Sequence, residues 1–137
     1  VINSFKVHGS QYMVHNLYKI ITDISEIESK TIIKVIVNED DEVMYMSRLP
    51  IPFSNPSLVQ NFKQQIPVYG FTVEALANFS DSRKTINEKF EDIELLRFLD
   101  LGHKIKMQET HVDSIAVDVP TDIAKVEAFL AGGMKGR

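Results

Sequence analysis

The sequence contains no cysteine. Disulfides, thiolate nucleophiles and zinc–thiolate sites are therefore excluded, and a cytoplasmic location is the setting that we expect. No apolar run reaches membrane-spanning length and no signal peptide is visible, so we expect no membrane association. The basic residues form no run and no aromatic RNA-binding motif accompanies them, which argues against a nucleic-acid partner.

What is present is the composition of an ordinary folded domain. The 137 residues are 44% hydrophobic and 25% charged, with a formal net charge of −4. These values predict one domain over residues 1–137, with enough apolar material for a core. Because the first residue is valine rather than methionine, we expect that the natural N-terminus is missing.

A β-hairpin is predicted in the first half of the chain. Thr31 to Val37 is rich in β-branched residues, Asn38 to Asp41 is polar and acidic, and Val43 to Ser47 alternates. This order is typical of strand, turn and return strand. We expect the acidic turn to be a solvated loop and not a metal site. Tyr12 to Ile21 fits either a strand or a short helix, and periodicity does not decide between them.

The next elements follow from capping and turn signals. Ser25 precedes Glu28 by three residues, the spacing of a capping box that starts a short helix. Gln65 to Phe71 is short and apolar and predicts a strand. Thr72 is then the expected N-cap of a helix over Val73 to Phe79.

The clearest predicted helix runs from Asn87 to Leu101, with Gly102 as its C-cap. Its apolar face is expected to contain Phe90, Ile93 and Leu99, with either Leu96 or Arg97 at the remaining position. Glu88, Glu91 and Glu94 recur every three residues. They fit a solvated acidic face near the helix start, or, for Glu94, a carboxylate that points into a site.

The stretch from Ser114 to Leu130 reads as strand, carboxylate, turn and helix, with Pro120 at the helix start. Asp118 follows the strand directly, where α/β sheets bind ligands, but it could equally cap the helix. With Lys104 to Glu109 as a further strand, the element order predicts an α/β domain in which helices flank a mixed sheet.

Two further sets of residues have open interpretations. Arg48 stands at the base of a proline-rich loop, where its guanidinium could bind an anionic ligand or pair with a surface carboxylate. His8 and His15 are seven residues apart, which matches no compact metal motif, so we expect surface or packed histidines.

Four segments together resemble the C-terminal half of the bacterial cytidylyltransferases that activate 3-deoxy sugar acids, namely the CMP-Kdo synthetases and the related CMP-sialic acid synthetases. The matched family motifs are K-V-V with Y-F-S-R-x-P-I-P, G-I-Y-A-Y, E-x-x-E-x-x-E-Q-L-R and V-D-T-P-E-D. The corresponding segments here are Ile33–Ile36 with Tyr45–Pro52, Ile66–Phe71, Glu88–Arg97 and Val117–Asp122. The resemblance implies part of the Rossmann-like fold of the nucleotide-diphospho-sugar transferases.

The resemblance also implies a reaction and a set of site residues. The hydroxyl of a 2-keto-3-deoxy sugar acid, Kdo-like or sialic-acid-like, would attack the α-phosphate of CTP, and pyrophosphate would leave. Asp118 would be the catalytic residue that holds Mg²⁺. Arg48, Gln65, Tyr69 and Glu94 would bind the sugar acid. Apart from the resemblance, the apolar strands Ile32 to Val37 and Val43 to Met46 would leave an exposed apolar face in a fragment of this size, so we expect a homodimer through this hairpin.

The departures from the family pattern lead to three more expectations. The upstream CTP-binding motifs L-A-A-R-x-x-S-x-R-L-P-x-K and Q-G-D-x-P are absent, so the chain would be the sugar-binding and dimerisation half and inactive alone. Alternatively, it is a truncated, non-catalytic relative that serves in dimerisation or sugar binding. Gln65 and Leu95 stand where CMP-Kdo synthetases have histidine and glutamine. They predict that the complete enzyme prefers a sugar acid related to Kdo over Kdo itself.

Overall fold

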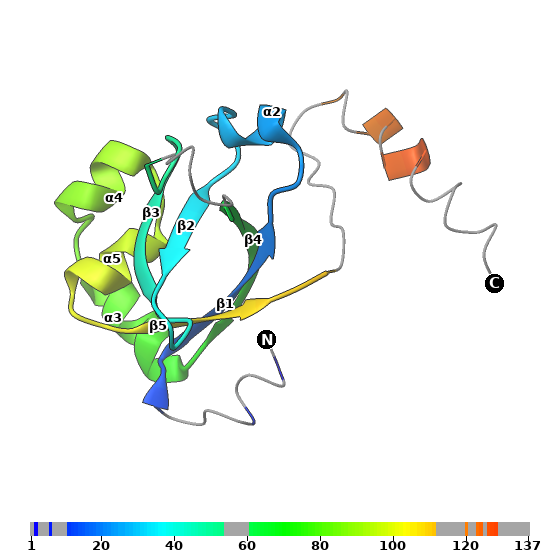
Figure 1. The fold of residues 1–137 in the computed structure, drawn as a ribbon. Coiled ribbons are helices and arrows are strands. Elements are labelled where there is room, and N and C mark those ends of the chain that lie inside the picture. The colour runs from blue at the N-terminus through cyan, green and yellow to red at the C-terminus, as the bar shows by residue number, and fades with distance from the viewer. Residues whose placement is uncertain are drawn as a thin grey trace.

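The computed structural model describes residues 11–53 and 61–111 without a break, and in addition residues 2, 6, 120, 123, 124 and 126–128. The continuous ranges form a mixed five-stranded sheet with helices beside it, as predicted (Figure 1). The elements in chain order are β1 (Val14–Ile20), α2 (Ile24–Ile27), β2 (Lys34–Val37), β3 (Val43–Ser47), β4 (Lys63–Phe71), α3 (Val73–Asp81), α4 (Ile86–Glu91), α5 (Leu95–Asp100) and β5 (Ile105–Glu109).

The strands are ordered β3-β2-β4-β1-β5 across the sheet. The β1–β5 pair is parallel and the other three pairs are antiparallel, which makes the sheet mixed. β2 and β3 form the predicted hairpin. The segment Tyr12 to Ile21, which fitted either a strand or a helix, contains the strand β1, and β1 is second from one edge of the sheet. Figure 1 shows α3, α4 and α5 gathered on one side of the sheet.

The core lies between the sheet and these helices. Strand residues such as Val14, Met46 and Ile105 are fully buried there with Leu96 and Phe98 of α5. Apolar burial of this kind is the main favourable term in folding. None of the helices in the described ranges is long and apolar enough to cross a membrane.

The predicted caps have mixed outcomes. Thr72 caps α3, because its hydroxyl accepts the N–H of Ala75 at 3.1 Å. Gly102 follows α5 with a φ of +82°, and its N–H donates to the carbonyl of Leu99, as expected for a C-terminal glycine. The capping-box prediction for Ser25 is wrong, because Asp23 is the N-cap and accepts the N–H of Ser25.

The single helix predicted over residues 87–101 is also wrong. It is two helices, α4 and α5, because Asp92 adopts a left-handed conformation with a φ of +55° and ends α4. The break changes the direction of the chain, so that Phe90 is 81% exposed and does not share the buried face of Ile93 and Leu96.

The tip of the hairpin is not the purely solvated loop that we expected. Glu42 accepts hydrogen bonds from the Tyr12 hydroxyl at 2.8 Å and from the Lys104 ammonium at 2.8 Å. The Tyr18 hydroxyl donates to Asp41 at 3.2 Å. Burial and the nearby Asp41 carboxylate raise the pKa of Tyr18 to about 12. The tip is therefore held against β1 and β5.

The stretch from Ser114 to Leu130 is described only in part. Pro120, Ile123, Ala124 and residues 126–128 are helical, in agreement with the helix predicted to start at Pro120. The predicted strand before it and Asp118 lie outside the described residues.

Candidate functional site

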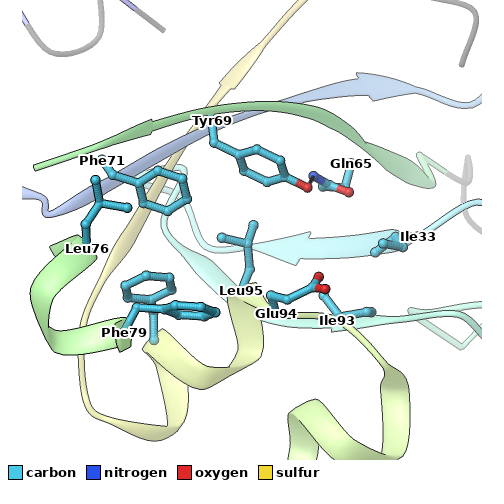
Figure 2. A pocket seen from close by; sticks show the side chains of 10 residues that line it. Ile33, Gln65, Tyr69, Phe71, Leu76, Phe79, Ile93, Glu94 and Leu95 are labelled. Carbon is cyan, nitrogen blue, oxygen red and sulfur yellow. Dashed lines mark hydrogen bonds between the residues drawn. The ribbon is translucent and has the colours of Figure 1, made fainter. Parts of the chain in front are cut away.

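A cavity of about 400 Å³ lies between β4 and the helices α3 and α5. Its polar lining residues are Gln65, Tyr69 and Glu94. Figure 2 shows the Tyr69 hydroxyl beside the Gln65 amide on β4, with Glu94 and Leu95 facing them from the start of α5. Three of the four predicted sugar-binding residues are thus brought to one cavity, and Leu95 lies there with them.

An aromatic ladder forms the apolar wall of this cavity. Tyr69 stacks on Phe71 at 5.8 Å, Phe71 on Phe98 at 5.7 Å, and Phe98 on Phe79 at 5.4 Å between ring centroids. Arg97 lies over the ring of Phe79, with its guanidinium carbon 3.7 Å from the ring centroid. Such stacking fixes the rings, so the wall is preformed.

The sequence analysis missed this wall. Phe71 follows Tyr69 by two residues in a strand, a spacing that places both side chains on the same face. That signal could have assigned Phe71 to the site. Phe79 and Phe98 had no comparable local signal, because their contact depends on how α3 and α5 pack.

The polar edge of the cavity has a defined hydrogen-bond pattern. Gln65 is only 5% exposed, and its amide donates to the Tyr69 hydroxyl at 3.1 Å and to the Ile66 carbonyl at 3.2 Å. Tyr69 is 42% exposed, so its ring reaches from the strand into accessible space. An amide, a hydroxyl and a carboxylate are groups that bind sugar hydroxyls well.

Glu94 is the one charged side chain among the described residues that line the cavity. It immediately precedes α5 and is exposed. The cavity thus presents a negative charge opposite the Gln65–Tyr69 pair, next to the apolar side chain of Leu95 (Figure 2). The prediction that Glu94 points into a site agrees with this position.

Glu88 and Glu91 differ from Glu94 in their surroundings. Glu88 is 1% exposed and forms a two-pronged ion pair with Arg97, with both N–O distances at 2.6 Å. The Arg97 guanidinium holds the pKa of the Glu88 carboxyl below its ordinary value, mainly through these hydrogen bonds. The prediction of a solvated acidic face is therefore wrong for Glu88, which joins α4 to α5 beneath the aromatic wall.

Arg48 is not among the residues that line the cavity. Its guanidinium donates to the carbonyls of Glu91 at 2.8 Å and Asp92 at 2.9 Å, and more weakly to that of Lys30 at 3.2 Å. The Glu91 carboxylate in turn accepts the Arg48 backbone N–H at 3.0 Å. Arg48 therefore caps the C-terminal end of α4, where free carbonyls favour a cation. Its role as an anion ligand stays a prediction.

Lys34 belongs to the segment that matched the K-V-V motif, but the sequence analysis gave it no role. It is fully buried, and its ammonium donates to the carbonyls of Ser29, Ile32 and Arg48 at 2.6–2.7 Å. Burial lowers the pKa of this lysine. The three bonds tie the chain before β2 to the loop after β3, next to Ile33 at the cavity.

Within the described residues, no three His, Asp or Glu side chains are grouped so that they could hold a metal ion. His15 is buried in β1, with its ring 6.0 Å from that of Tyr12, and His8 lies outside the described residues. Asp118, the predicted Mg²⁺ ligand, also lies outside them. The described residues alone therefore do not make a metal site.

Taken together, the mixed sheet and a preformed cavity with three polar groups over an aromatic wall define an α/β domain suited to a small ligand rich in hydroxyls. A model of the cytidylyltransferase family matches residues 2–106, and the chain belongs to this family.

Two curated proteins similar in sequence to this chain are cytidylyltransferases by name. The chain is 36% identical over 110 residues to a 3-deoxy-manno-octulosonate cytidylyltransferase of Christiangramia forsetii, covering 80% of this chain and 44% of that protein. It is 32% identical over 131 residues to an 8-amino-3,8-dideoxy-manno-octulosonate cytidylyltransferase of Shewanella oneidensis, covering 96% of this chain and 54% of that protein. The chain thus spans about half the length of these curated relatives.

A solved structure supports the same assignment. The structure of CMP:2-keto-3-deoxy-manno-octonic acid synthetase complexed with CTP superposes with a TM-score of 0.88 at 25% identity, over 96% of this chain and 54% of that one. The resemblance inferred from four motifs is confirmed, and so is the Rossmann-like nucleotidyltransferase fold, of which this chain forms about half.

Proposed function

We propose that this chain is the sugar-acid-binding half of a cytidylyltransferase that transfers CMP from CTP to a 3-deoxy-manno-octulosonate-type sugar acid and releases pyrophosphate. The observation that carries the proposal is the convergence of Gln65, Tyr69 and Glu94 on one cavity in a chain of this family. The relatives reported above act on octulosonates by name, and none of them supports the sialic-acid alternative.

In this proposal the residues of the chain bind and orient the sugar acid. Tyr69 and Gln65 donate to and accept from its hydroxyls, and Glu94 accepts from them. The aromatic wall covers the apolar face of the sugar ring and excludes water. Holding the attacking hydroxyl near the α-phosphate is a large part of catalysis in phosphoryl-type transfer.

The test is product formation by the complete protein that carries this chain. Incubation with CTP, Mg²⁺ and an octulosonate should give a CMP-sugar by mass spectrometry, together with pyrophosphate. If the complete protein forms no CMP-sugar with any octulosonate but still binds one, the chain is the non-catalytic sugar-binding relative that we kept as the alternative.

The finer proposal concerns the substituent on the sugar acid. Glu94 is the one charged group of the described cavity lining, and Leu95 beside it offers no hydrogen bond. A carboxylate can form a charge-assisted hydrogen bond with an ammonium group, whereas a hydroxyl offers it only a neutral one. The Shewanella relatives, which match over 96% of the chain, act by name on an 8-amino octulosonate. We therefore propose that the preferred substrate is an amino-substituted octulosonate.

This preference is measured as the ratio of kcat/KM for the 8-amino acid to that for the 8-hydroxy acid. Glu94→Gln removes the negative charge and should lower the ratio about tenfold, roughly the 1.4 kcal/mol that one modest charge contact supplies. Leu95→Gln should lower it less, by improving turnover of the hydroxy acid. Equal turnover of both acids by the wild-type protein would contradict the proposal.

Magnesium is proposed on the resemblance alone, with Asp118 as a ligand. A hard carboxylate suits Mg²⁺, which neutralises phosphate charge when it is bound. In the complete protein, Asp118→Asn should keep any helix cap, because asparagine caps as well as aspartate does. Turnover with CTP and Mg²⁺ should fall by orders of magnitude while the midpoint of urea unfolding stays the same. Near-normal turnover of the Asp118→Asn variant would contradict the role of Asp118 as a Mg²⁺ ligand and would leave helix capping as its role.

A further inference from the structure

Asn16 lies in the middle of β1, opposite an irregularity in β4. In the register of the two strands, His15 faces Gly70 and Leu17 faces Ile66. One residue of β1 therefore stands against three residues of β4, Pro67 to Tyr69. This is a β-bulge with two extra residues, and bulges re-aim the side chains beside them.

The side chain of Asn16 fills the gap that the bulge leaves in the ladder. Its amide nitrogen donates to the Ile66 carbonyl at 2.9 Å and to the Val68 carbonyl at 2.8 Å. Pro67, between these carbonyls, has no N–H of its own to offer. A primary amide has two hydrogens on one nitrogen, which match the two acceptors.

Among the described residues, the side chain of Asn16 has partners for its amide nitrogen but none for its amide oxygen. Asn16 is 1% exposed, and among the described residues nothing donates to its amide oxygen. A buried amide that uses its nitrogen fully and its oxygen not at all is oriented by the two carbonyls that it binds. An apolar residue of similar size would remove the donor to the Val68 carbonyl and leave the Ile66 carbonyl with only the longer bond from the Gln65 amide, at 3.2 Å.

The bulge adjoins the cavity. Gln65 and Tyr69 stand on either side of the irregular part of β4, one before Ile66 and one at the end of the three residues that face Asn16. Here the Gln65 amide and the Tyr69 hydroxyl are in hydrogen-bond contact at 3.1 Å and line the same cavity (Figure 2). Both residues flank the segment whose carbonyls Asn16 holds.

We propose that Asn16, which does not line the cavity, is a positioning residue for sugar-acid binding: it fixes the β4 bulge and thereby the Gln65–Tyr69 pair. The binding part of this inference rests on the proposed function. The geometric part does not, because it concerns only the hydrogen bonds of Asn16 and the contact between Gln65 and Tyr69.

The test compares Asn16→Leu, which removes both donors, with Val35→Ala, a core change at the β2 residue that pairs with Lys63 at the start of β4, before the bulge. In the complete protein, Asn16→Leu should raise the KM for the sugar acid tenfold or more and leave the KM for CTP unchanged. Val35→Ala should lower the unfolding midpoint without changing either KM. An unchanged KM for the sugar acid in folded Asn16→Leu, or the same rise in Val35→Ala, would overturn the proposal.

Two additions keep the test decisive. If Asn16→Leu does not fold, Asn16→Ser, which keeps one donor, replaces it and should show a smaller rise in the same KM; no rise would overturn the proposal. If the wild-type protein uses no sugar acid, the proposed function fails, but crystal structures still decide the geometric part. Loss of the Tyr69–Gln65 contact in the variant is expected, and its retention overturns the inference.

Discussion

At the scale of single residues, three glutamates spaced three residues apart have three different surroundings. Glu88 is buried against Arg97, Glu91 accepts the backbone N–H of Arg48, and Glu94 lines the cavity. Regular spacing predicts one common face only while the helix continues. The left-handed Asp92 interrupts the helix and separates Glu94 from the other two. Glu88 and Glu91 both lie in α4, and they differ because Glu88 meets Arg97 whereas Glu91 meets Arg48.

The Glu88–Arg97 pair predicts a large effect on stability. Glu88→Gln should lower the free energy of unfolding by about 3 kcal/mol, because removing one partner leaves a buried, uncompensated charge. Urea unfolding of the full chain measures this. Glu74→Gln is the matched control, since Glu74 is exposed in the first turn of α3 and should change stability by less than about 0.5 kcal/mol.

The same pair predicts a dependence on pH. The pKa of Glu88 is lower in the folded than in the unfolded chain, so its stabilising effect is complete above the ordinary value of 4.5. It is lost as the pH falls through the lowered pKa. The difference in stability between wild type and Glu88→Gln should therefore shrink below that pH. A difference that stays constant down to pH 2 would contradict the assignment.

At the scale of elements, Arg48 illustrates what local sequence could not reveal. Its position at the base of a proline-rich loop suggested an anion ligand, but its guanidinium reaches the carbonyls at the end of α4, over forty positions along the chain. No pattern near Arg48 encodes that contact. Thr72 and Gly102, by contrast, were predicted correctly because a cap depends only on neighbouring residues.

Arg48→Lys tests whether the cap is the main role. Lysine keeps the positive charge but has no planar guanidinium group, so it cannot donate to the carbonyls of Glu91 and Asp92 in the same way at once. We expect the free energy of unfolding to fall by about 1–2 kcal/mol and the KM for the sugar acid to change less than threefold. A rise in that KM without loss of stability would instead support Arg48 as a ligand for the acid.

The strands and the polar site residues were largely accessible from sequence. Alternation placed the hairpin, and motif resemblance placed Gln65, Tyr69 and Glu94, which the fold brings to one cavity. The break at Asp92, the ion pair of Glu88 and the bulge held by Asn16 were not accessible. Each depends on contacts between residues that are not neighbours in sequence, and local propensity does not record these.

At the scale of the whole molecule, the reasoning behind the predicted homodimer needs a correction. We expected the apolar residues of the hairpin to form an exposed face. Val35, Val43 and Met46 are buried in the core, and Met44, on the edge strand β3, is 63% exposed. The homodimer therefore stays a prediction that rests on family resemblance and on this edge.

Light scattering measures the homodimer directly. At high micromolar concentration the wild-type protein should have twice the mass of one chain, and Met44→Lys on the edge strand should shift it toward the monomer, because a lysine disfavours pairing at an edge. Glu39→Lys at the hairpin tip, also an exposed position, is the control. A monomeric wild type under these conditions would contradict the prediction.

The central claim is that the cavity of Gln65, Tyr69 and Glu94 is the sugar-acid site of a CMP transferase. The most direct measurement is the pair of KM values, for CTP and for the octulosonate, in the complete protein with Tyr69→Phe. Losing the hydroxyl should raise the KM for the octulosonate about tenfold, in line with one lost hydrogen bond of about 1–1.5 kcal/mol, while the KM for CTP stays the same. An unchanged KM for the octulosonate, or a rise only in that for CTP, would contradict the account.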